Sequence, residues 1–232
     1  MRPLSDVAGL SWVPSRGARA LVLDADRTLS PVDTGRQVGA LLGLNSRIRE
    51  MFEATGYTVE AFFRHAKIWS AVPMPAYLAA IDEVMQSVQL HDAWLRVLGG
   101  APDVPKVVVT AGIPQLWESV LGRFGFHDVA VLGGLHSERD ASFVTPACKA
   151  WVVRELRRAG FHVSAAGDSE IDLEMLKAAD LGLFVADMKG SPRLLRRLPK
   201  GGGIHHFATD ARRFPPLPTL DADELLDRLL ED

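Results

Sequence analysis

The chain has 232 residues, of which 47% are apolar and 24% are charged, which is the composition of a folded globular protein. This composition excludes a disordered tail and a collagen-like chain, and the formal net charge of −3 does not favour a polyanion-binding protein or a basic membrane anchor. Cys148 is the single cysteine, which excludes an intrachain disulfide and a thiolate zinc site of the finger type.

The first twenty residues contain no apolar stretch as long as that of a signal peptide. No window of about 18 apolar residues predicts a transmembrane helix either. We therefore expect a cytoplasmic protein with no membrane partner and no nucleic-acid partner. The length predicts one domain with an insertion, or two small domains, and leaves a homodimer open.

Continuous apolar runs predict strands that are buried on both faces, as in a parallel sheet. The expected strands are Ala18–Ala25, Lys106–Thr110, Asp128–Leu132, His162–Gly167, Leu181–Ala186 and a short edge strand at Ile204–Phe207. Helical spacing of apolar side chains predicts helices at Pro114–Phe124, Pro146–Gly160, Glu170–Ala179, Ser191–Leu198 and Asp221–Asp232. This alternation predicts an α/β fold, a Rossmann-like parallel sheet with flanking helices.

The stretch between the first two expected strands is helical instead. It spans about 80 residues, far more than an ordinary connection between a strand and a helix. Its amphipathic segments are Arg36–Ala54, Val59–Ile68, Pro75–Val88 and Asp92–Val97. We expect an α/β core domain of residues 1–32 and 101–232, and a small inserted helical domain of residues 33–100.

Carboxylates and hydroxyls gather where the expected strands end. Asp24, Asp26 and Thr28 follow the first strand. Because ligands bind beyond the carboxyl ends of the strands in an open α/β sheet, these residues form a candidate cation and phosphate site, although a turn with capping aspartates would give the same local pattern. Further polar residues are expected at the same edge of the sheet: Thr110, Lys149, Asp168 and Asp172.

The ordered set of DxDxT at 24–28, Thr110, Lys149 and GDSxxD at 167–172 resembles the four motifs of the haloacid dehalogenase-like (HAD) phosphatase superfamily. The resemblance covers residues 18 to 190, and the pattern is most similar to phosphoserine phosphatase and its relatives. It implies a HAD-like core, and it implies that the inserted helical domain is a cap between the first and second motifs.

The resemblance also implies the roles of the motif residues. Asp24 is expected to attack phosphorus and form an aspartyl-phosphate, which divides hydrolysis into two steps. Asp26 is expected to protonate the leaving alkoxide and then to deprotonate water. Thr110 would hydrogen-bond a phosphoryl oxygen, and Lys149 would stabilise charge in the transition state. Thr28 would hold the loop that carries Asp26, and Thr28 itself is expected among the substrate-binding residues.

A phosphate dianion repels bare carboxylates, and a divalent cation offsets this charge. Hard oxygen ligands favour magnesium. By resemblance, the ligands are the side chains of Asp24 and Asp168 and the main-chain carbonyl of Asp26. Asp172 would support a metal-bound water or orient Lys149.

We expect the substrate to be a small phosphorylated metabolite that the cap recognises. Asp33 lies where phosphoserine phosphatases have a glutamate that contacts an amine, but it also suits the N-cap of a helix. Arg27 stands where family members usually carry a small residue, and it either pairs with a Glu or Asp of the cap or is a second anchor for an anionic group on the substrate. Arg64 is a candidate for binding a carboxylate, with a solvated charge as the alternative. Ala111 and Gly112 complete the expected substrate-binding residues.

The leading hypothesis is a magnesium-dependent phosphomonoesterase. A phosphotransferase or mutase that uses the same aspartyl-phosphate is the second, and a non-catalytic HAD-fold binding protein is the third. The complete motif set argues against the third hypothesis. Dehalogenation is disfavoured because true haloacid dehalogenases lack the aspartate that stands here as Asp26.

Overall fold

The computed structural model describes residues 18–134, 143–185, 197, 203–210 and 217–231. Their strands form one sheet in the order β3-β2-β1-β4-β5-β6-β7, and every neighbouring pair is parallel. The strands are β1 (Arg19–Leu23), β2 (Lys106–Val109), β3 (Ala130–Leu132), β4 (His162–Gly167), β5 (Leu181–Phe184), β6 (Ile204–Phe207) and β7 (Thr219–Leu220). The predicted α/β fold is therefore confirmed, and β1 lies between β2 and β4.

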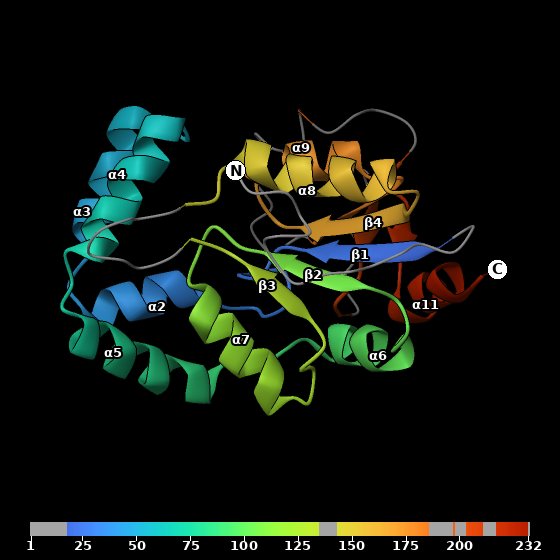
Figure 1. Cartoon of the computed structure of the whole chain (residues 1–232), viewed down its shortest axis with the longest axis horizontal. Helices are drawn as coiled ribbons and strands as arrows, with labels where there is room; N and C mark the ends of the chain where they lie inside the picture. The colour runs from blue at the N-terminus through green and yellow to red at the C-terminus, as the bar shows by residue number, and fades with distance from the viewer. Residues whose placement is uncertain (1–17, 135–142, 186–196, 198–202, 211–216, 232) are drawn as a thin grey trace.

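Helices cover both faces of the sheet (Figure 1). One face carries α8 (Pro146–Arg158) and α9 (Leu173–Ala178), and the other carries α6 (Asp92–Gly100), α7 (Pro114–Arg123) and α11 (Ala222–Leu230). Because side chains alternate along a strand, Leu21 and Leu23 of β1 pack towards α6 and α7, whereas Ala20 and Val22 pack towards α8. Burial on both faces explains why the strands are continuous apolar runs.

Four helices follow β1 and extend beyond the carboxyl ends of the strands (Figure 1). They are α2 (Thr34–Leu41), α3 (Asn45–Thr55), α4 (Val59–Ser70) and α5 (Met74–Ser87). Helix α5 is fixed to the core, because its buried side chains join the same apolar cluster as α7. The guanidinium of Arg123 on α7 also donates to the carbonyls of Met85 and Gln86, at 2.7 and 2.6 Å, at the end of α5.

Helix α6, which we expected within the inserted domain, packs on the sheet beside α11. Its Trp94 is fully buried, with its ring centroid 4.2 Å from that of Phe207 on β6. The indole N–H of Trp94 donates to the carbonyl oxygen of Thr28 at 2.8 Å. The division into a core domain and a cap domain stays a prediction. Within the described part of the chain, no helix is both long and apolar enough to cross a membrane.

The structure corrects several predicted elements. The segment Arg36–Ala54 forms two helices, α2 and α3, because Gly43 between them adopts the left-handed φ of 69°. Strand β6 is not an edge, since β7 pairs with it, and two residues are too short for a recognisable pattern. Helix α9 begins at Leu173 rather than Glu170. The predicted helix Ser191–Leu198 lies outside the described residues, apart from residue 197.

Candidate active site

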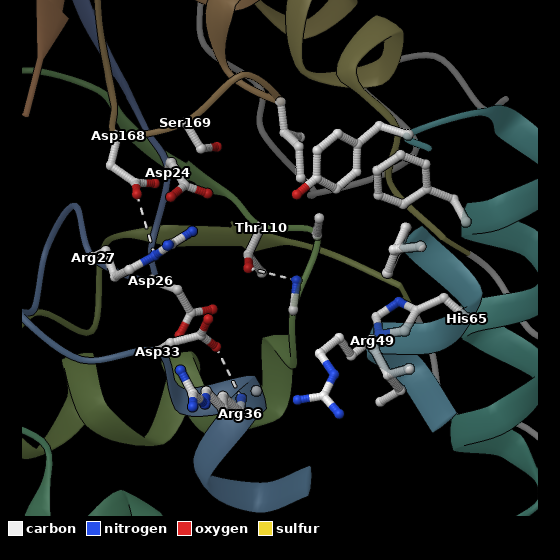
Figure 2. A pocket seen from close by; sticks show the side chains of 18 of the residues that line it. Asp24, Asp26, Arg27, Asp33, Arg36, Arg49, His65, Thr110, Asp168 and Ser169 are labelled. Atoms are coloured by element: carbon white, nitrogen blue, oxygen red, sulfur yellow. Dashed lines mark hydrogen bonds and ion pairs between the residues drawn. The ribbon is translucent and has the colours of Figure 1, made fainter. Parts of the chain in front are cut away.

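The carboxyl ends of β1, β2 and β4 meet at one edge of the sheet, where Asp24, Thr110 and Asp168 follow them. A cavity of about 580 Å³ opens there. Loops of the α/β core and the start of α2 line one end, which we call the core end, and residues of α3, α4 and the loop between them line the opposite end, which we call the cap end (Figure 2). The parallel sheet therefore brings together the motif residues that are far apart in the sequence.

Asp24 is buried at the core end, and both of its carboxylate oxygens accept hydrogen bonds. The hydroxyl of Thr28 donates to Oδ2 at 3.0 Å, and the ammonium group of Lys149 donates to Oδ1. Burial and the nearby Asp172 carboxylate raise the pKa of Asp24 to about 7, although Lys149 opposes this shift. The backbone N–H of Asp24 donates to the carbonyl of Ala166 on β4 at 2.8 Å, so this position is held by the sheet itself.

Lys149 comes from the first turn of α8 and bridges two buried carboxylates. Its ammonium group lies 2.7 Å from Oδ1 of Asp172, in addition to its contact with Asp24. The other oxygen of Asp172 accepts from the N–H and the hydroxyl of Ser169, at 3.0 and 2.7 Å. Burial alone would lower the pKa of Lys149, but the two carboxylates raise it above its ordinary value, so the side chain is charged. This contact supports one of the two roles expected for Asp172, that it orients Lys149, and both roles stay predictions.

Asp24, Asp168 and Asp172 each offer a carboxylate oxygen, and these three oxygens lie within 4.8 Å of one another. Burial and the neighbouring Asp24 and Asp172 raise the pKa of Asp168 to about 8. The guanidinium of Arg27 lies 3.2 Å from Oδ2 of Asp168. Oxygen donors with no nitrogen or sulfur suit Mg²⁺, and a divalent cation would offset the repulsion between these carboxylates.

Asp26 is held by the first residue of α2. The N–H and the hydroxyl of Thr34 both donate to Oδ1 of Asp26, each at 2.6 Å. Burial and Asp33 raise the pKa of Asp26 to about 6, while the hydrogen bonds from Thr34 lower it. Oδ2 lies beside Gly112, where a methyl group would come within 2.7 Å of it, so this close approach requires glycine. One oxygen of Asp26 is thus fixed, and the other faces the loop after β2.

Thr110 lies between the two aspartates and the cap end, and its hydroxyl oxygen accepts the N–H of Gly112 at 2.9 Å (Figure 2). The hydroxyl proton of Thr110 can therefore be donated to a ligand. Ala111 and Gly112 also line the cavity. The N–H of Gly112 is already bonded to Thr110 within the loop. Direct binding of the substrate by Ala111 or Gly112 stays a prediction.

Arg27 has the left-handed φ of 59°, which is strained for a residue other than glycine. The sequence suggested a partner in the cap or a substrate anchor. The partner is instead Asp168 on the core loop after β4. The side chain of Arg27 also lines the cavity, so its role as a substrate anchor stays a prediction.

Two expected substrate-binding residues do not line the cavity. Thr28 is fully buried behind Asp24 and acts on that carboxylate, so it has no surface to offer a substrate. Arg64 lies on an exposed face of α4, where it pairs with Glu60 at 2.8 Å. Of the two predictions for Arg64, this arrangement fits the solvated charge and not the carboxylate-binding residue. Asp33 does line the cavity, and it is also the N-cap of α2, accepting the N–H of Arg36 at 2.9 Å.

The cap end contains residues that our sequence analysis missed. Aromatic side chains of α3, α4 and the loop between them form what we call the aromatic wall: Phe52, Tyr57, Phe62, His65 and Trp69. The side chain of Arg49 on α3 lies near this end beside His65, whereas Arg36 lies beside Asp33 (Figure 2). The spacing of residues 62, 65 and 69 along one helix face is the signal that could have grouped them.

Comparisons with known proteins agree with this fold. A profile of haloacid dehalogenase-like hydrolases matches residues 21–177. A phospho-aspartyl intermediate analogue of phosphoserine phosphatase is similar in structure, with 13% identity and a TM-score of 0.58 over 78% of this chain and 99% of the other. A HAD family hydrolase from Salmonella enterica serovar Typhi has 18% identity and a TM-score of 0.65 over 94% of this chain and 73% of the other. A search of curated proteins gave no match.

Proposed function

Because the chain belongs to the family of haloacid dehalogenase-like hydrolases, we propose that it is a magnesium-dependent phosphomonoesterase that hydrolyses a small phosphorylated metabolite through an aspartyl-phosphate. The observation that carries this proposal is Asp24, a buried carboxylate that faces the cavity and accepts hydrogen bonds from Lys149 and Thr28. These two donors favour the ionised form, which is the form that attacks phosphorus.

In the first step, an oxygen of Asp24 forms a bond to phosphorus while the bond from phosphorus to the ester oxygen breaks. Lys149 and the hydroxyl proton of Thr110 stabilise the charge on the phosphoryl oxygens. Asp26, whose pKa is raised to about 6, supplies the proton that the leaving alkoxide needs. The products of this step are the free alcohol and a phosphorylated Asp24.

In the second step, water attacks the phosphorus of the aspartyl-phosphate. Asp26 is now ionised, so it accepts the proton of this water as it attacks. Asp24 leaves as a carboxylate, with Lys149 again offsetting its charge. The fixed position of Asp26, held by two hydrogen bonds from Thr34, suits a group that serves as acid and then as base at one site.

The carboxylates of Asp24 and Asp168 and the main-chain carbonyl of Asp26 are the groups that would hold Mg²⁺ in this proposal. Bound there, the ion neutralises the substrate's negative charge and orients the phosphoryl group. The carboxylate oxygens of Asp24 and Asp168, which lie within 4.8 Å of each other, support their part of this assignment.

Phosphate release from a panel of phosphorylated metabolites tests the proposal, with magnesium and with excess chelator. We expect activity with magnesium, little in chelator, and a loss of at least about 1,000-fold for Asp24→Asn. Asp82→Asn makes the same chemical change on the exposed surface of α5 and should keep the wild-type rate. Full activity in chelator, or an active Asp24→Asn enzyme, would contradict the proposal. Product analysis with added alcohols separates hydrolysis from transfer to another acceptor.

A further inference from the structure

The aromatic wall is a continuous set of rings at the cap end of the cavity. The ring centroid of Phe52 lies 5.4 Å from that of Tyr57, 5.6 Å from Phe62 and 5.3 Å from His65. His65 in turn contacts Trp69, with 6.0 Å between their centroids. These distances are typical of aromatic pairs in direct contact.

Other parts of the described chain do not bury the apolar side of α3. None of its residues is buried, although Ile48 and Phe52 point apolar side chains into the cavity. Tyr57, just after α3, leaves 54% of its surface exposed. An apolar surface of this kind, inside a concave site that also holds the catalytic carboxylates, is typical of a ligand-binding surface.

The polar ring atoms of Trp69 and His65 in the wall carry no charge. The indole N–H of Trp69 donates to Nε2 of His65 at 2.8 Å. An indole nitrogen can only donate, so Nε2 of His65 is the acceptor and its proton resides on Nδ1. Burial lowers the pKa of His65 to about 4, so the imidazole is uncharged at neutral pH. The wall therefore presents uncharged rings to the cavity.

We propose that the substrate is a phosphomonoester of an alcohol that carries an aromatic ring, which packs against Phe52 and Tyr57 while the phosphate lies at Asp24. This inference rests on the proposed function for the position of the phosphate. It is carried by the uncovered rings and the shared cavity. A volume of about 580 Å³ accommodates a ring in addition to the phosphate and its linker.

A series of alkyl phosphates tests the proposal, because the leaving groups are all primary alcohols and the chemical step is matched. We compare benzyl, 2-phenylethyl and 3-phenylpropyl phosphate with cyclohexyl analogues of the same lengths and with propyl phosphate. At the best length, kcat/KM for the phenyl compound should exceed that for propyl phosphate at least about 30-fold, because the ring is removed from water. It should exceed that for the cyclohexyl compound by about 3- to 10-fold, because flat rings stack on the wall.

Substitutions in the aromatic wall show which residues cause the preference for phenyl over cyclohexyl compounds. Phe52→Leu and Tyr57→Leu keep apolar groups but remove a ring, so each should reduce the phenyl-to-cyclohexyl ratio towards 1. Phe63→Leu is the matched control, because Phe63 is on α4 but lies outside the cavity, with 41% of its surface exposed and its ring 6.0 Å from Phe143. It should keep the wild-type ratio. Melting temperatures of all three variants show whether the fold is retained. An equal loss in Phe63→Leu would overturn the proposal.

Calorimetric binding of the corresponding phosphonates, which cannot be hydrolysed at the ester position, separates this inference from the proposed function. Tighter binding of phenyl than of cyclohexyl phosphonates supports the aromatic substrate even if no phosphate ester is turned over, in which case the proposed function alone fails. Turnover of all esters with a phenyl-to-cyclohexyl ratio near 1 at every length, and equal phosphonate affinities, would overturn the aromatic substrate while the phosphatase stands.

Discussion

At the core end of the cavity, the buried Lys149 donates hydrogen bonds to the buried carboxylates of Asp24 and Asp172, whereas at the cap end Phe52 and Tyr57 leave ring surface uncovered. The core-end groups follow neighbouring strands or begin a helix that packs on the sheet. The cap-end groups come from short helices that extend beyond it (Figure 1). The sheet therefore holds the groups that we propose to react in fixed positions, and α3 and α4 provide a surface that can differ without altering them.

This difference between the two ends predicts that substitutions at each end affect the kinetics in a different way. A change at the core end should slow all substrates alike, because it acts on the phosphoryl group that they share. A change at the cap end should alter the ratio between substrates, because it acts on the part in which they differ.

Lys149→Met should reduce kcat/KM by about 100- to 1,000-fold for phenylalkyl and propyl phosphates alike, because one charged donor to the phosphoryl group is lost. Steady-state kinetics on both substrates measure this effect. Lys177→Met is the control, since Lys177 pairs with Glu174 on the exposed side of α9 at 3.3 Å. A loss confined to one substrate would show that Lys149 acts in recognition instead of chemistry.

Thr34→Val should reduce turnover of alkyl phosphates by about 10-fold, because Asp26 loses one of two short hydrogen bonds to a charged acceptor. The effect should be smaller on 4-nitrophenyl phosphate, whose leaving group needs little protonation. Thr55→Val removes a hydroxyl that donates to the carbonyl of Met51 within α3 and serves as the control. Equal losses on alkyl and nitrophenyl esters would argue that Thr34 does not act through Asp26.

Arg27→Gly should lower the magnesium concentration needed for half-maximal activity by about 2- to 5-fold, the range expected for a partly exposed ion pair. The substitution frees Asp168 from a competing cation and removes the strain of φ 59°. Magnesium titration of activity and of melting temperature measures the change. Arg27→Lys keeps a cation and the strained backbone, so it should resemble the wild type. A higher magnesium requirement in Arg27→Gly would mean that Arg27 holds Asp168 in place for the metal.

The smallest expected effect is on stability against pH. The pKa values of Asp26, Asp24 and Asp168 are raised from 3.8 to about 6, 7 and 8 in the folded chain. The folded state thus binds more protons than the unfolded state between about pH 4 and 8, so the free energy of unfolding of the metal-free protein falls as pH rises through this window. Magnesium replaces those protons, and its stabilisation should grow with pH. Melting temperatures at pH 5.5 and 8, with and without magnesium, test this prediction. A magnesium shift that is the same at both values would contradict it.

The core end could be predicted from the sequence because its residues have fixed places in the fold. Asp24, Thr110 and Asp168 each follow an apolar run, and parallel strands bring the ends of such runs together. The burial of Thr28 could not be predicted, because it depends on how the loop after β1 folds back under Asp24. The pairing of Arg27 with Asp168 depends on the left-handed backbone at residue 27, which no local pattern indicates.

The cap end was less predictable for a physical reason. Aromatic side chains on amphipathic helices indicate an apolar face but not what that face meets, which can be another helix or a cavity. Phe62 is buried and Tyr57 is exposed, yet both are aromatic residues near the ends of short helices. The break at Gly43 also rotates α3 relative to α2, so the residues facing the cavity could not be placed from the periodicity of one continuous helix.

Acid-quench phosphorylation of the Asp26→Asn variant tests whether Asp24 is the nucleophile. With 4-nitrophenyl phosphate the attack by Asp24 needs little help from an acid, whereas hydrolysis of the intermediate needs the base that this variant lacks. We predict that protein-bound phosphate accumulates stoichiometrically on the peptide that contains Asp24, and that Asp24→Asn in the same background abolishes it. A burst of 4-nitrophenol with no phosphate on the protein, or phosphate on a different residue, would show that Asp24 is not the nucleophile.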